Sequence, residues 1–147
     1  MVERMNEQEV RAFLAHGTRT GKLAWVARSG QPHVAPIWFV VDDTTTDAVE
    51  VVFNTGATSA KGKAIRRDPR VSLLVDDERP PFAYVKLTGA VTVSEDLDEL
   101  RRWAARIGGR YMGAARAEEF GARNGAAGEL LVRLRAAKVD GLRDIAD

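Results

Sequence analysis

Hydrophobic and polar positions alternate along much of the chain, and this pattern predicts more strand than helix. Residues 22–28 alternate, and residues 82–93 do so over a longer span. Residues 33–41 are more continuously apolar, which is typical of a strand that is covered on both faces. The same criteria predict three further strands, over residues 49–55, 71–75 and 130–134.

Helical spacing occurs in shorter stretches between these strands. Asn6 and Glu9 have the spacing of a capping box, and they begin a predicted helix that ends at His16 and Gly17. Further helices are predicted over residues 58–67, 96–107 and around 114–122. The tail, residues 139–147, fits neither pattern clearly.

Two hairpins in succession, formed by the first three predicted strands, indicate an antiparallel meander rather than strands joined by crossover helices. Six strands with short helices between them predict a small antiparallel barrel of the α+β or mainly β class. The length of 147 residues is that of one domain, over residues 1–147. An exposed face rich in tryptophan on so small a sheet also favours pairing with a second copy.

Composition excludes several classes of function. The chain has no cysteine, which rules out disulfides, zinc ribbons, iron–sulfur clusters and a thiol nucleophile. A net charge of +1 argues against a protein that coats nucleic acid or an anionic membrane. The longest apolar run, residues 35–41, is far shorter than the ~20 residues of a membrane helix, and the first residues are too polar for a secretion signal. We therefore expect a cytoplasmic protein with no nucleic-acid or membrane partner.

Hydrolytic and metal-dependent chemistry finds no support in the sequence. The two histidines, His16 and His33, lie in no metal-binding array, and no serine lies in a Gly-x-Ser-x-Gly turn. His33 begins a strand, where it either meets a ligand or is an ordinary edge residue. No metal site is predicted, and no catalytic residue can be named.

The segment 54–70 carries the most informative chemistry, because a Gly/Ala/Thr/Ser stretch leads from a strand into a helix that begins with lysines. Free amides and the helix dipole favour an anion at such a position, and Ser59, Lys61 and Lys63 add a hydroxyl and two charges. A phosphate or an acidic tail suits this chemistry, although no Walker pattern is present. The alternative is a solvated basic helix face capped by Ser59, with the lysines exposed.

Aromatic residues give a second indication. Trp38, Phe82 and Tyr84 lie in strands or at their starts, where flat rings either line a planar ligand or pack in the core. Trp25 and Trp103 are interpreted as core residues.

The order of these motifs resembles that of the flavin/deazaflavin oxidoreductases with a split β-barrel fold, also called the pyridoxamine-phosphate-oxidase-like family. The branch it resembles most is the actinobacterial one that uses the deazaflavin coenzyme F420. The resemblance runs from about residue 21 to the last strand, through segments 21–26, 32–39, 59–75 and 84–89. Its sharpest part is Ala60-Lys61 followed by Ile65-Arg66-Arg67-Asp68-Pro69-Arg70.

The resemblance implies a role for each part of the site. Lys61 binds the cofactor phosphate, and Lys63 supports it or meets an acidic tail. The second strand lies along the tricyclic ring, the end of the third strand meets the ribityl chain, and Phe82 and Tyr84 come from the partner subunit of a homodimer. The implied cofactor site consists of His33, Pro36, Ile37, Trp38, Asn54, Thr55, Ser59, Ala60, Lys61, Gly62, Lys63, Phe82 and Tyr84.

The implied reaction is hydride transfer from reduced F420 to an activated double bond or a quinone-like small molecule. Alternatives are an FMN-binding reductase or oxidase of the same fold, and a carrier that binds the cofactor without turnover. The Trp-x-x-Arg-Leu-type ending of true pyridoxamine phosphate oxidases is absent, so oxidation of vitamin B6 is not expected.

Overall fold

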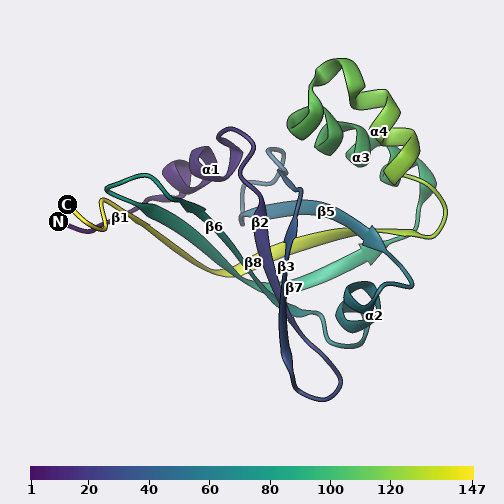
Figure 1. The fold of residues 1–147 in the computed structure, drawn as a ribbon, viewed down its shortest axis with the longest axis horizontal. Helices are drawn as coiled ribbons and strands as arrows, with labels where there is room; N and C mark the ends of the chain where they lie inside the picture. Colours follow the sequence, from purple (N-terminus) through teal and green to yellow (C-terminus); the bar gives the residue numbers. More distant parts are fainter.

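An antiparallel sheet rolled into a half-barrel forms the body of the protein, whose computed structural model describes all residues from 1 to 147 (Figure 1). Its strands are β1 (Glu3–Arg4), β2 (Gly21–Val26), β3 (Pro32–Ile37), β4 (Val40–Val41), β5 (Glu50–Gly56), β6 (Arg70–Asp77), β7 (Ala83–Ser94) and β8 (Glu129–Arg143). The helices are α1 (Glu7–Ala15), α2 (Ala60–Arg67), α3 (Leu97–Met112) and α4 (Ala117–Asn124), with a 3-10 turn at Ala114–Arg116. No helix is both long and apolar enough to cross a membrane.

The predicted strand over residues 33–41 is two strands in the structure. β3 pairs with β2 and β4 pairs with β5, at opposite ends of the strand order β3-β2-β6-β7-β8-β5-β4. The chain leaves the sheet at Trp38 and Phe39, where it crosses from one edge to the other. Both predicted hairpins exist, but β6 joins β2 and β8 lies between β7 and β5, so the order is not a simple meander.

The ambiguous tail belongs largely to β8. This strand has 15 residues, which is long enough to pair with both β7 and β5. Its register against β7 shifts between Thr88 and Gly89, which leaves Ala137 without an opposite residue. A Cβ at Gly89 would lie 2.1 Å from the Arg135 carbonyl oxygen, so the strands approach closely at this bulge. The bulge shifts the side-chain alternation of β8, which is why the sequence pattern is unclear there.

Two apolar clusters hold the fold together. The larger contains 18 buried residues inside the half-barrel, among them Leu23, Phe39 and Phe53. In the smaller cluster, α3 packs Trp103 and Ile107 against the sheet. Trp103 is thus a core residue as predicted, whereas Trp25 is only partly buried. The helix continues five residues past the predicted end at Ile107, through two glycines that the sequence pattern favours as a stop.

An ion pair between the buried Asp42 and the partly buried Arg133 anchors the turn after β4. Asp42 is 4% exposed, and its carboxylate accepts hydrogen bonds from the amide and hydroxyl of Thr44 and from Arg133 on β8. Burial alone would raise the pKa of Asp42, but these hydrogen bonds and the charge of Arg133 hold it below its usual value.

This lowered pKa predicts a pH dependence of stability. The stabilising contribution of Asp42 is present above the unfolded-state pKa of about 3.9 and is lost as the pH falls through the lower folded-state pKa. We expect Asp42→Asn to be less stable than the parent at pH 7, with a smaller loss of stability on acidification below about pH 4. Urea unfolding at several pH values measures this, and parallel pH curves for the two proteins would contradict it.

Candidate functional site

A cavity of about 330 Å³ brings together the ends of β3 and β5, the start of α2, the start of β8 and the helices α3 and α4. These helices and α2 lie at the same end of the molecule, opposite the two termini (Figure 1). Six residues predicted from the sequence line the cavity, namely Pro36, Ile37, Trp38, Asn54, Thr55 and Lys61. Four further lining residues are Gly56, Ile107, Asn124 and Glu129.

Local hydrogen bonds fix the start of α2 beside the cavity. Ser59 is the N-cap: its hydroxyl accepts from the Gly62 amide at 3.0 Å and donates to the Gly56 carbonyl at 2.8 Å. A Cβ at Gly62 would lie 2.1 Å from that carbonyl oxygen, so only glycine allows this approach. The hydroxyl of Ser59 and the amide of Gly62 are therefore engaged with the protein. The amides of Ala60 and Lys61 donate no hydrogen bond within the chain.

Lys61 is half-buried rather than exposed, and it forms no ion pair within 4.0 Å. Burial lowers the pKa of the Lys61 ammonium, and the charge of Glu129 opposes this shift. Burial in turn raises the pKa of Glu129, against the opposing effects of Lys61 and the Asn54 amide. The cavity thus contains a desolvated cation and a desolvated carboxylate that influence each other without a close ion pair.

Asn54 and Thr55 form the β5 side of the cavity. The Asn54 side-chain amide donates to the Asn124 carbonyl at 2.9 Å, which ties β5 to the end of α4. Thr55, the next residue of β5, also lines the cavity and is otherwise buried. The bond from Asn54 places the end of α4 on the cavity wall. The sequence pattern did not connect this helix with the site.

Trp38, the one aromatic residue that lines the cavity, packs against two further aromatic side chains. Trp38 stacks on Tyr111 of α3, with ring centroids 5.2 Å apart and planes at 6°, and meets the edge of Phe120 of α4 at 5.8 Å. The Tyr111 hydroxyl donates to the Arg19 carbonyl at 2.8 Å and accepts from the Phe39 amide at 3.3 Å. Trp38 is therefore held by two side chains of the same subunit, neither of which lines the cavity.

The remaining predicted residues lie elsewhere. His33 is at the other end of β3, where it stacks on Trp25 at 5.8 Å. Ala60, Gly62 and Lys63 belong to α2 without lining the cavity, and Lys63 is exposed. Phe82 and Tyr84 are at the start of β7, at the end of the molecule that holds the termini, since the Ile145 amide donates to the Phe82 carbonyl. Their assignment to a partner subunit stays a prediction.

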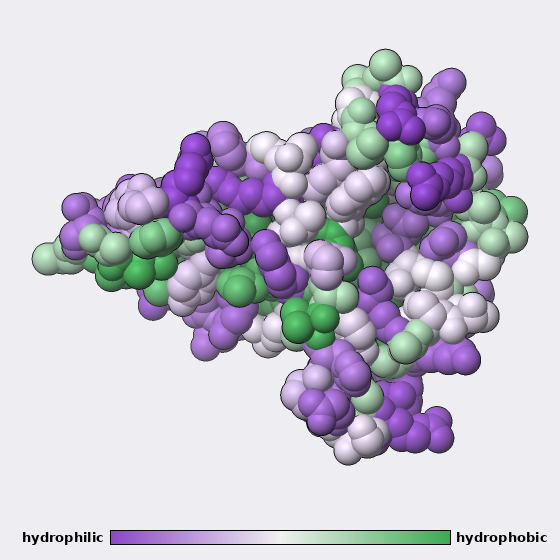
Figure 2. Space-filling view, in the orientation of Figure 1, coloured by the Kyte–Doolittle hydropathy of each residue, from purple (hydrophilic) through white to green (hydrophobic).

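That distant end carries an apolar surface. Figure 2 shows hydrophobic atoms gathered where the two termini meet. The exposed apolar residues there include Met1, Val2, Phe82 and Ile145. Phe82 is 40% exposed and has a left-handed backbone conformation with φ of 68°.

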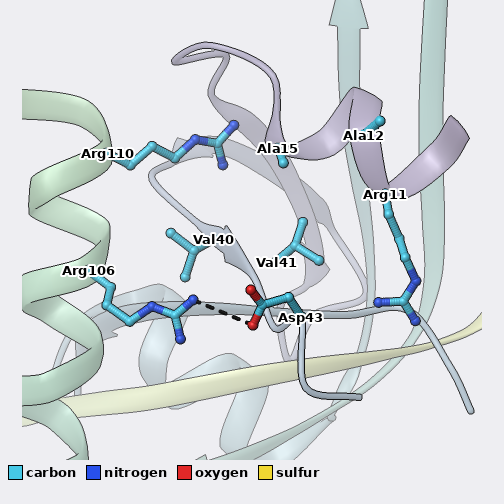
Figure 3. Close-up of a pocket in the computed structure, with 8 residues that line it drawn as sticks. All are labelled: Arg11, Ala12, Ala15, Val40, Val41, Asp43, Arg106 and Arg110. Atoms are coloured by element: carbon cyan, nitrogen blue, oxygen red, sulfur yellow. Dashed lines mark ion pairs between the residues drawn. The ribbon is translucent and has the colours of Figure 1, made fainter. Parts of the chain in front are cut away.

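A second cavity, of about 460 Å³, lies between α1, β4 and α3 (Figure 3). Its three arginines already have partners within the chain. Arg110 donates to three backbone carbonyls, Arg11 donates to the Ala48 carbonyl at 2.8 Å, and Arg106 pairs with Asp43 at 3.9 Å. These side chains join the elements around the cavity, so the cavity around Lys61 is the stronger candidate for a cofactor.

Comparison with known proteins identifies the family. The sequence profile of pyridoxamine 5'-phosphate oxidase matches residues 7–143. The chain belongs to the pyridoxamine 5'-phosphate oxidase-like family. No curated protein matches the chain in sequence.

Solved structures confirm the split-barrel fold of this family member. A conserved hypothetical protein of Mycobacterium tuberculosis, Rv2991, is 27% identical with a TM-score of 0.79, and the match covers 97% of this chain and 89% of that one. A protein described as an F420 reductase is 21% identical with a TM-score of 0.69, covering 87% and 94%. A FAD-binding protein of Mesorhizobium loti is 23% identical with a TM-score of 0.68, covering 97% of each chain.

Several residues of the site were not found by sequence reasoning. Glu129 precedes an apolar strand, and Asn124 ends a helix in a Gly/Ala-rich segment, so neither has a motif around it. Ile107 was predicted only as the last residue of a helix. All three reach the cavity through pairings between elements distant in the sequence, which no local pattern reveals.

Proposed function

We propose that the protein is an F420-dependent reductase that transfers a hydride from the reduced deazaflavin to an activated double bond or a quinone-like acceptor. The observation that carries the proposal is the half-buried Lys61, which faces the cavity without an ion-pair partner. A desolvated cation with no partner in the protein suits an anionic ligand group. A similar structure that is described as an F420 reductase supports the choice of cofactor.

The residues around the cavity fit such a cofactor. Lys61 and the free amides of Ala60 and Lys61 suit a phosphate, and the opposite wall of Pro36, Ile37 and Trp38 suits a flat apolar ring. When bound, the reduced deazaflavin supplies the hydride. The residues of the chain then have to bind the cofactor, orient it and exclude water.

A flavin-dependent reductase or oxidase is the second candidate. The observation that favours it is the likeness to a FAD-binding protein over 97% of both chains. FMN would place its phosphate at the same lysine, so the geometry of the cavity suits both cofactors.

The experiment is a titration of the purified protein with F420 and with FMN, after absorbance spectra have shown whether yellow flavin is already bound. Turnover of a quinone or enone is then measured with each reduced cofactor. Tight F420 binding with turnover supports the proposal. Tight FMN binding without a response to F420 would favour the second candidate, and binding without turnover would indicate a carrier.

We further propose that the protein works as a homodimer, with the site at the subunit interface. The exposed apolar end around Phe82 lies opposite the end that holds the cavity, so one subunit cannot bring the two together. A second copy in the reverse orientation would bring the apolar end of one subunit to the cavity of the other. Sedimentation at micromolar concentration is expected to show a dimer, and a strict monomer would contradict this arrangement.

A further inference from the structure

The cavity is lined by only two charged residues, one of each sign. Lys61 is the second residue of α2, and Glu129 is the first residue of β8, where it lies opposite Gly56 in the register with β5. Both side chains are partly buried, and neither has an ion-pair partner within 4.0 Å. The formal charge of the cavity lining is therefore zero, although its lysine is suited to an anion.

A cavity lining with no net charge is expected to bind phosphate groups of different charge with different affinity. A phosphate monoester carries a charge of about −1.5 to −2 at pH 7, because its second pKa is about 6. A phosphodiester carries a single negative charge. Beside one lysine and one carboxylate, the monoester leaves about 0.5 to 1 more uncompensated negative charge than the diester. Repulsion is stronger in a partly desolvated site than in water.

The two candidate cofactors differ in this group. FMN ends in a phosphate monoester, whereas the phosphate of F420 is esterified on both sides. We propose that Glu129 is a specificity-determining residue that lowers the affinity of the cavity for doubly charged phosphate monoesters and thereby favours F420 over FMN. This inference rests on the proposed function, because it requires the cofactor phosphate to lie at Lys61.

The test is Glu129→Gln, which removes the charge and keeps the shape of the side chain. Dissociation constants are measured for FMN, F420 and riboflavin, which lacks the phosphate. We expect FMN to bind about tenfold more tightly, equivalent to about 1.4 kcal/mol. F420 should gain about three- to fivefold, because the repulsion scales with the charge of the phosphate, and riboflavin should be unchanged. Glu118→Gln, a change of an exposed glutamate on α4, is the control and should alter none of the three.

Melting curves show whether each variant is folded. Glu129→Ala also removes the charge, so it must shift the ratio of FMN to F420 affinity in the same direction as Glu129→Gln. An unchanged ratio in protein that binds F420 would overturn the role of Glu129 and leave the proposed function standing. A change of equal size for riboflavin would show an effect unrelated to phosphate and would also overturn it. Failure of the parent and of both variants to bind either cofactor would overturn the proposed function and this inference together.

Discussion

Lys61→Ala is expected to weaken cofactor binding by about ten- to hundredfold. The ammonium would donate a charge-assisted hydrogen bond to the phosphate, and such bonds are commonly worth ~1.5–3 kcal/mol. Because Lys61 is half-buried without an ion-pair partner, no interaction within the protein competes for it at close range. Titration calorimetry with F420 and with FMN measures the loss.

The same substitution should not lower the melting temperature of the cofactor-free protein. Burial lowers the pKa of Lys61, which means that the fold disfavours its charged form. Removing the charge therefore costs the fold nothing electrostatically, apart from the distant attraction of Glu129. Lys63→Ala is the matched control, since Lys63 is exposed on the same helix and outside the cavity lining. Equal affinity losses in both variants, or none in Lys61→Ala, would show that the phosphate site is wrongly placed.

Local features of the fold were predictable from sequence because their physics is local. The Asn6 side chain accepts from the Glu9 amide at 2.8 Å, as the capping-box spacing predicts. Ser59 caps α2 three residues before Gly62 in the same way. These contacts span three residues, so the sequence alone determines which groups can meet.

The break between β3 and β4 could not be predicted in this way. Residues 34–41 are all apolar, and nothing in the run marks Trp38 and Phe39 as the crossing point. The break arises because the two ends of this segment pair with strands at opposite edges of the sheet. Burial of Phe39 and the hydrogen bond from its amide to Tyr111 then hold the crossing in place. Tyr111 is distant in the sequence, and so are β6 and β8, whose pairings with β2 and β5 place those two strands in separate parts of the sheet.

The residues of the candidate site also divide into those that a local sequence pattern reveals and those that depend on the tertiary fold. Lys61 was found because a strand leads directly into a basic helix, and Asn54 and Thr55 were implied by the family resemblance. Glu129 was missed, because its presence in the cavity depends on the register of β8 against β5. The charge balance of the cavity is thus a property of the tertiary fold, even though each charged residue is visible in the sequence.

Arg110 is expected to be a main stabilising contact of the crossing between β3 and β4. Its guanidinium donates to the carbonyls of Leu14 and Phe39 at 2.7 Å and of Gly17 at 3.0 Å, and it lies 4.8 Å from the Phe39 ring centroid. One side chain of α3 therefore ties the end of α1 to the chain segment that carries Trp38. Figure 3 shows Arg110 extending from α3 toward α1.

Arg110→Met keeps most of the aliphatic packing but leaves three carbonyls without their charged donor. Hydrogen bonds to charged groups contribute ~1.5–3 kcal/mol each and are not additive, so we expect a loss of about 3 kcal/mol in the free energy of unfolding. For a protein of this size, this corresponds to a fall in melting temperature of about 10 °C. Arg102→Met serves as the control, because Arg102 is exposed on the same helix and forms no hydrogen bond or ion pair. We also expect weaker cofactor binding in Arg110→Met, since Phe39 adjoins the cavity residue Trp38. Matching melting temperatures for the two variants would show that the carbonyls find other donors and that Arg110 does not hold the crossing.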